Sequence, residues 1–244
     1  DMSDPKKQSQ TLGVLTRLCD DYEAWIGTIE RQVGSLDSPL QEAAGKNIAR
    51  CKDCLSRMKG GVELLKTDEV TFTAFCLVNE AMLSQQLHYR MPLAKWEGGR
   101  SGNFKGLALD VNMQDRSSWP SNGVHVYGKW RTFQIAFVLM NLKSMRYSGS
   151  AERELVDLIW FPTGGGKTEA YLGLTAFTLF IRRLLDKDDD GVAVLMRYTL
   201  RLLTTQQFER ASSLICACEK IRERMPECLG ASRFSIGLWV GQST

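Results

Sequence analysis

Three consecutive glycines at 164–166 stand directly before Lys167 and Thr168, and this stretch restricts the fold more than any other. The apolar run LVDLIWF precedes the glycines at 155–161, and an amphipathic run follows them over 167–185. Glycine adopts positive φ at little steric cost, so these residues permit a tight turn between two regular elements. We therefore predict a strand at 155–161 that turns directly into a helix at 167–185.

The stretch FPTGGGKT matches the end of the phosphate-loop pattern G-x-x-x-x-G-K-[ST]. Backbone N–H groups of such a turn close around phosphate oxygens, and the following helix N-terminus adds favourable partial charge. The ammonium of Lys167 is expected to reach the β- and γ-phosphates of ATP, and the Thr168 hydroxyl to bind Mg²⁺. The first glycine of the pattern falls on Phe161, which departs from it. The predicted nucleotide-binding residues are Thr163, Gly164, Gly165, Gly166, Lys167 and Thr168, of which the last two are also the predicted catalytic residues.

Apolar runs and amphipathic helices alternate after the glycines. VAVLM at 192–196 and FSIGLWV at 234–240 have the near-continuous apolarity of buried parallel strands, and a helix is expected between them at 204–224. Connections of these lengths imply a parallel sheet with right-handed crossovers. We therefore predict an α/β fold, with an incomplete RecA-like P-loop parallel sheet over 130–244.

The first third of the chain has helical periodicity instead. Ser38 and Pro39 are a favourable N-cap and first residue for a helix, which we expect to weaken at Gly60 and Gly61. Residues 1–90 are therefore predicted to be a helical N-terminal region. The helices predicted outside the sheet span 10–34, 39–59, 68–90 and 130–145.

A loop-rich connector is predicted at 91–129, where glycine and proline disfavour long helices and GLALDVNM and GVHVYG resemble short strands. The chain carries a net charge of only +3, yet residues 86–150 hold nine basic and three acidic side chains. Basic side chains among aromatic ones can bind single-stranded nucleic acid through phosphate contacts and stacking. The alternative is a solvated loop region that its aromatic side chains anchor.

Hydropathy and the polar start of the chain predict a cytoplasmic protein with no membrane partner. No apolar run reaches the roughly 18 residues that a membrane span requires, because Arg182 and Arg183 interrupt the longest one. The opening DMSDPKKQSQ lacks the apolar core of a signal peptide.

The P-T-G-x-G-K-T loop resembles motif I of superfamily-two helicases and translocases, in which the first position of the loop varies. Such enzymes often carry an R-x-x-Q pair ahead of the loop, and WRTFQIAF at 130–137 is similar. The resemblance implies that Gln134 reads the adenine edge and that Arg131 or Phe133 packs near the base. A glutamine amide offers the donor and the acceptor that adenine requires. The alternative is an ordinary polar residue on an amphipathic helix.

The segment VLMRYTLRLLTTQQFERA resembles motif Ia of the same enzymes, although it lacks the usual proline and is a few residues longer. It follows a predicted parallel strand, where α/β sheets place their binding groups. Hydroxyls, amides and arginines suit contacts with a phosphate backbone. A capped helix start with surface arginines is the alternative. The candidate nucleic-acid contacts are Arg197, Thr199, Arg201 and Gln206, together with Gly241 in the following SIGLWVGQST.

The combination of WFPTGGGKTEAYLGL, RYTLRLLTTQQFERA, LICACEKIR and FSIGLWVG resembles the helicase subunits of bacterial DISARM anti-phage defence systems. AFCLVNEAMLSQQ and WRTFQIAFVLMNL extend the resemblance upstream, so that it covers roughly residues 50–244. It implies an ATP- and Mg²⁺-dependent helicase or translocase that engages DNA and works with a second DISARM subunit.

An ATPase of this type also needs an acidic motif that holds Mg²⁺ and activates water, and we find none. DKDDDG at 186–191 reads as a solvated turn, and Asp157 lies within the predicted strand before the loop. We therefore expect an N-terminal portion of a longer protein that binds nucleotide weakly and does not hydrolyse ATP alone. The alternatives to a motor are a P-loop ATPase of another class, such as a signalling ATPase, and a scaffold with a degenerate loop.

Overall fold

The computed structural model describes residues 2–89, 95–97, 103–105, 128–162, 164–197 and 201–239. These residues are mainly helical. The elements in chain order are η1 (Pro5–Lys7), α1 (Gln8–Gln32), η2 (Val33–Ser35), α2 (Ser38–Thr67), α3 (Glu69–Tyr89), β1 (Lys95–Glu97), β2 (Asn103–Lys105), α4 (Thr132–Arg146), η5 (Ala151–Glu154), α5 (Lys167–Leu185), α6 (Arg201–Arg224) and α7 (Pro226–Leu229).

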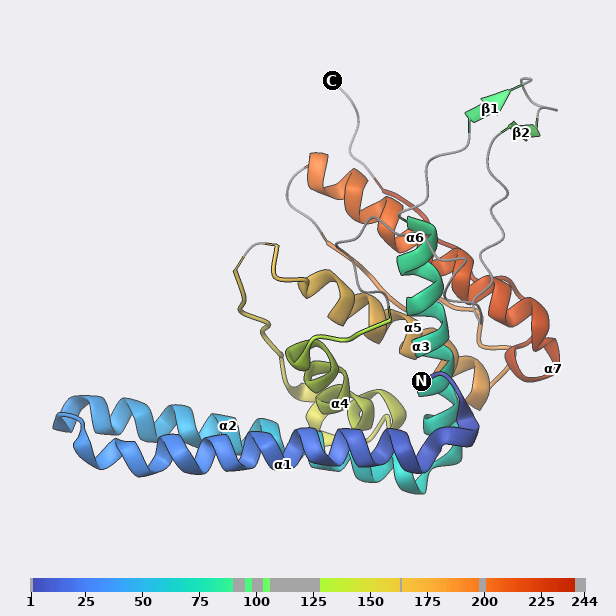
Figure 1. Cartoon of the computed structure of the whole chain (residues 1–244). Helices are drawn as coiled ribbons and strands as arrows, with labels where there is room; N and C mark the ends of the chain where they lie inside the picture. The colour runs from blue at the N-terminus through green and yellow to red at the C-terminus, as the bar shows by residue number, and fades with distance from the viewer. Residues whose placement is uncertain are drawn as a thin grey trace.

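Helices α1 and α2 form a long antiparallel hairpin whose far end extends away from the other helices (Figure 1). Their facing sides bury apolar residues at helical spacing, including Leu15 and Ile26 on α1 and Leu55 on α2. Two ion pairs, Lys59 with Glu23 and Lys52 with Glu30, cross the seam at its exposed edge. The apolar seam holds the two helices together, since exposed ion pairs contribute little.

Helix α2 passes through Gly60 and Gly61 without interruption, so the predicted weakening at these glycines is wrong. Gly61 is buried where α2 crosses α4, and a Cβ there would lie 2.2 Å from the carbonyl oxygen of Leu139. A Cβ at Gly60 would meet nothing within 4 Å. Gly61 therefore permits the close approach of two helix backbones, and packing against α4 offsets the low helix propensity of the pair.

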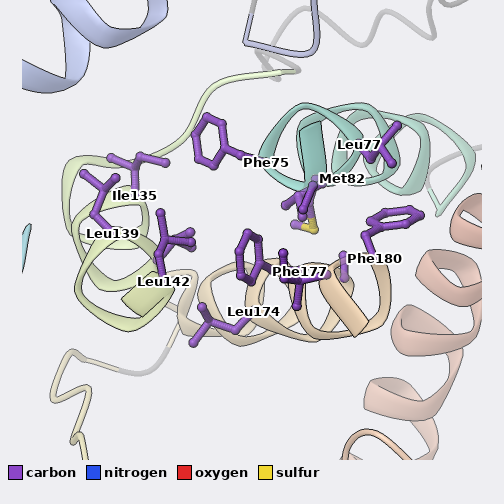
Figure 2. Close-up of a cluster of buried hydrophobic side chains, with 14 of the residues drawn as sticks. Phe75, Leu77, Met82, Ile135, Leu139, Leu142, Leu174, Phe177 and Phe180 are labelled. Atoms are coloured by element: carbon purple, nitrogen blue, oxygen red, sulfur yellow. The ribbon is translucent and has the colours of Figure 1, made fainter. Parts of the chain in front are cut away.

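The centre of the core lies where α3, α4 and α5 meet (Figure 2). Helix α3 is buried along most of its length, in agreement with its near-continuous apolarity, and α5 and α6 pack against it. Figure 2 shows buried apolar side chains of the three helices clustered where the helices meet. The labelled ones are Phe75, Leu77 and Met82 of α3, Ile135, Leu139 and Leu142 of α4, and Leu174, Phe177 and Phe180 of α5.

The predicted α/β fold with a RecA-like parallel sheet is wrong. The only strands among the described residues are β1 and β2, which pair antiparallel with Trp96 opposite Phe104. The segments predicted as strands, 155–161, 192–196 and the described part of 234–240, contain no strand. Apolar runs indicate a preference for burial, whereas a strand also needs a neighbour that completes its backbone hydrogen bonds. No described segment supplies that ladder.

The segment 155–161 instead leaves a row of alternate apolar side chains in solvent. Val156, Leu158 and Trp160 are 96%, 84% and 84% exposed. Apolar side chains at every second residue are typical of a strand with one buried face. Here no sheet among the described residues covers them. Two short strands were predicted in the connector, at 106–113 and 123–128. Both lie outside the described residues except for Gly128.

The junction between α2 and α3 is closed by Asp68, the residue before α3. One carboxylate oxygen accepts a 2.7 Å hydrogen bond from the Thr71 N–H, and the other accepts one of 2.8 Å from Nε of Arg146 at the end of α4. Burial alone raises the pKa of Asp68, but these hydrogen bonds outweigh it and hold the pKa below its ordinary value. The carboxylate therefore stabilises the fold in its charged form.

Replacement of Asp68 by alanine should lower the free energy of unfolding by about 1–2 kcal/mol at pH 7. Because the folded-state pKa is depressed, this contribution is present above the unfolded-state pKa near 4 and is lost as pH falls through the lower folded-state value. Urea denaturation at pH 7 and at pH 3 measures both effects. The matched control is Asp37→Ala, since Asp37 precedes α2 but makes no capping hydrogen bond. Equal losses in the two variants at pH 7 would contradict the assignment.

Candidate phosphate-binding turn

The three glycines form the predicted turn, and each position has its own requirement for glycine. Gly164 and Gly166 have φ of +80° and +85°, in the left-handed region. The N–H of Gly165 donates a 3.0 Å hydrogen bond to the carbonyl of Pro162, and a Cβ at Gly165 would lie 2.9 Å from that oxygen. Any side chain at these positions would therefore strain or displace the turn.

Arg131 and Gln134, the predicted base-contacting pair, hold the turn from the start of α4. The Arg131 guanidinium donates to the carbonyl of Gly165 at 2.8 Å, and the Gln134 amide donates to that of Gly166 at 2.7 Å. The Gln134 side-chain oxygen also accepts from the Arg131 N–H at 2.8 Å. Gln134 is only 4% exposed, and both ends of its amide are engaged. Because so little of the side chain reaches solvent, contact between Gln134 and adenine would require its surroundings to open.

Phe161, the departure from the usual glycine, has a structural role that sequence reasoning did not find. Its ring stacks on Phe133 of α4, with centroids 4.0 Å apart and planes 20° from parallel. Such offset ring pairs add to the stabilisation that apolar burial provides. The aromatic side chain therefore ties the entrance of the turn to the helix that also binds its carbonyls.

Asp157 is likewise engaged by a residue that the sequence did not single out. Two 2.6 Å hydrogen bonds join its carboxylate to the guanidinium of Arg57 on α2, and Glu152 lies 3.6 Å from the same guanidinium. The Asp157 hydrogen bonds raise the pKa of Arg57. A bidentate pair of this kind anchors the segment before the turn to the helical hairpin.

Lys167 folds back over the turn that precedes it. Its ammonium donates to the carbonyls of Phe161 and Pro162, at 2.5 Å and 3.2 Å. The hydroxyl of Thr168, the predicted Mg²⁺ ligand, is largely buried and lies 3.1 Å from the hydroxyl of Tyr171. Both predicted catalytic residues therefore lie in the first turn of α5, next to the glycines.

The N-terminus of α5 carries three backbone N–H donors for which no described residue is an acceptor. No side chain caps Gly166, and no described residue accepts a hydrogen bond from the N–H groups of Gly166, Lys167 or Thr168. Glu169, the next residue, instead pairs through one carboxylate oxygen with the guanidinium of Arg210 on α6. Neither Glu169 nor Arg210 was among the predicted site residues, although a glutamate at the third helical position is a recognisable capping signal.

The predicted nucleic-acid contacts are only partly described. Arg197 and Gln206 are exposed, and no hydrogen bond joins either side chain to the glycine turn. Helix α6 begins at Arg201, three residues before the predicted start. Thr163, Thr199 and Gly241 lie outside the described residues, as does the side chain of Arg201. The DNA contact therefore stays a prediction.

Two absences hold for the described residues. No helix there has the length and apolarity needed to cross a membrane. No group of three or more histidine, cysteine, aspartate or glutamate side chains there is arranged to hold a metal ion.

The fold and the turn together define a helical protein with a lysine-bearing glycine turn at the N-terminus of a long helix. No protein-family model matches the chain. The chain is similar to the DISARM protein DrmA of Bacillus paralicheniformis, with 38% identity in an alignment that covers 96% of this chain. It spans about a fifth, 20%, of the length of that curated relative. The resemblance to DISARM proteins is confirmed at this level, and helicase activity stays a prediction.

Proposed function

We propose that this chain is the nucleotide-binding portion of an ATP-dependent DNA helicase or translocase that acts in DISARM defence against phage. The similarity to a DISARM protein over nearly the whole chain supports the defence role. The glycine turn and Lys167 support ATP as the ligand. The helicase-like segment at 194–211 supports DNA as the polymer on which the protein acts.

The observation that carries the proposal is the combination of donors at the start of α5. The N–H groups of Gly166, Lys167 and Thr168 have no described acceptor and lie at the positive end of a 19-residue helix. The Lys167 ammonium belongs to the same helical turn and donates to the carbonyls of Phe161 and Pro162. Phosphate oxygens would accept from both sets of donors at once, and the Thr168 hydroxyl would be a ligand of the accompanying Mg²⁺.

Arg131 and Gln134 have a supporting role in this proposal. They bind the carbonyls of Gly165 and Gly166 and so fix the backbone of the turn. A turn fixed in this way loses less conformational freedom when phosphate binds. Adenine contact by Gln134 is a further step that would require its buried side chain to become accessible to the base.

DNA contact and a second DISARM subunit complete the proposal. Arg197, Arg201 and Gln206 are the side chains that we expect to contact the phosphate backbone, because they lie at or near the start of α6. Contacts of this kind weaken as salt increases. The proposed partner subunit would bind the full-length protein while that protein is bound to DNA.

Two measurements test the proposal. Titration of residues 1–244 with a fluorescent ATP analogue and Mg²⁺ should reveal binding, with little or no hydrolysis. The full-length protein should hydrolyse ATP faster when DNA is added, and less so at high salt. ATP hydrolysis that is insensitive to DNA at every salt concentration would favour an ATPase of another class. Absence of nucleotide binding in both proteins would refute the proposal.

A further inference from the structure

We propose that Arg210 is a positioning residue that keeps the N-terminus of α5 open to phosphate by holding Glu169 away from it. This inference rests on the proposed nucleotide site and adds a residue to it that comes from a different helix. Arg210 lies on α6, 41 residues beyond Glu169, and their side chains are each 21% exposed.

Glu169 is the third residue of α5, the position from which a glutamate commonly caps its own helix. In that capping arrangement the carboxylate turns back and accepts a hydrogen bond from the N–H of the residue before the helix, which here is Gly166. Glu169 does not do so, because Arg210 draws one of its oxygens toward α6. The helix therefore keeps the donor that its own glutamate would otherwise occupy.

The second carboxylate oxygen of Glu169 shows how close the competing position is. It is buried, makes no hydrogen bond to a described residue, and would lie 3.4 Å from a Cβ at Gly166. This oxygen therefore lies at van der Waals distance from the side-chain position of Gly166, the residue whose N–H it would cap. Arg210 stabilises the carboxylate in its present place with an ion pair that is only partly exposed to solvent and is therefore weakly screened.

Without Arg210, the carboxylate and a bound phosphate would compete for one set of donors. Both are anions, and both are stabilised by the partial positive charge at the start of a helix. An unpaired carboxylate in the first turn of α5 would also repel the phosphate directly. We expect Arg210→Ala to weaken binding of ATP by about tenfold, which is the ratio that a difference of about 1.4 kcal/mol produces.

A double-mutant comparison separates this role from simple cross-linking of α5 and α6. Residues 1–244 are titrated with a fluorescent ATP analogue and Mg²⁺ as wild type, Arg210→Ala, Glu169→Ala and the double variant. We expect the tenfold loss in Arg210→Ala alone and recovery to within about twofold of wild type when Glu169 is also removed. If the ion pair matters only as a cross-link, all three variants lose affinity alike, and that result overturns the inference.

Two controls keep the outcome interpretable. Arg224→Ala removes another α6 arginine, whose partner Glu80 lies on α3, and should leave the affinity for ATP unchanged. Thermal melting of each variant checks that it is folded, and Arg210→Gln replaces Arg210→Ala if the shorter side chain prevents folding. Binding that depends on Lys167 but is unaffected by loss of Arg210 refutes this inference alone. No binding by the wild type refutes the proposed function.

Discussion

Replacement of Lys167 by alanine is expected to weaken ATP binding by residues 1–244 about a hundredfold and to remove most ATP hydrolysis by the full-length protein. Charge-assisted hydrogen bonds contribute about 1.5–3 kcal/mol each, and the ammonium would make at least one to the terminal phosphates. Its present acceptors, the carbonyls of Phe161 and Pro162, lie in an exposed stretch where water can replace it. The variant should therefore fold normally, and titration with a fluorescent ATP analogue measures the loss.

Lys187→Ala is the matched control for this variant. Lys187 follows α5 in an exposed turn at the opposite end of the same helix, so the substitution changes the net charge equally. Its affinity for ATP should equal that of the wild type. If Lys167→Ala also kept full affinity and full hydrolysis, the glycine turn would have no part in nucleotide binding.

Gly61→Ala is the substitution with the largest expected effect on stability. The added methyl would lie 2.2 Å from the Leu139 carbonyl oxygen, so α2 and α4 would have to separate. Overpacking of this kind costs about 2–3 kcal/mol of unfolding free energy. The consequence extends to the turn, because α4 also carries the residues that bind the glycine carbonyls. Urea denaturation followed by circular dichroism measures the change.

Gly60→Ala provides the comparison within the same helix. A Cβ at Gly60 has open space around it, so this variant gains helix propensity without a clash. It should be more stable than the wild type by up to about 1 kcal/mol. If both variants changed the free energy of unfolding by the same amount, α2 and α4 would not approach each other closely at Gly61.

Much of the helical structure follows from local sequence. The predicted helices at 10–34, 68–90, 130–145 and 167–185 agree with α1, α3, α4 and α5 to within about two residues at each end. Periodicity and end signals suffice there, because each helix has a long apolar stripe and identifiable termini. The glycine turn was equally predictable, since two positive φ angles directly before a helix require the residue that the sequence repeats three times.

The sheet was not predictable from the same kind of signal. LVDLIWF, VAVLM and FSIGLWV were interpreted as parallel strands because they are short, apolar and separated by helices. The described residues contain no ladder between them, and Val156, Leu158 and Trp160 lie in solvent. Local apolarity measures how strongly a segment favours burial, whereas strand formation depends on a second segment that pairs with it.

In the candidate site, local patterns predicted individual residues but not the distant residues that contact them. Lys167 and Thr168 were predicted as site residues because the phosphate-loop pattern is local, and Gln134 and Arg131 because of the R-x-x-Q resemblance. The sequence did not predict the partners of Arg131 and Gln134, which are the carbonyls of Gly165 and Gly166. Arg210 is 41 residues from Glu169, and Arg57 is 100 residues from Asp157. No spacing rule links residues at such separations.

The sequence by itself determined the helices, the turn and the position of a lysine at its end, since these depend on residues that are close along the chain. Only the tertiary structure decided what surrounds the turn: α4 holds its carbonyls, α2 anchors the segment before it, and α6 draws Glu169 aside. The physical reason is that backbone preferences act over a few residues, whereas hydrogen bonds and ion pairs form between whichever side chains the packing of helices brings together.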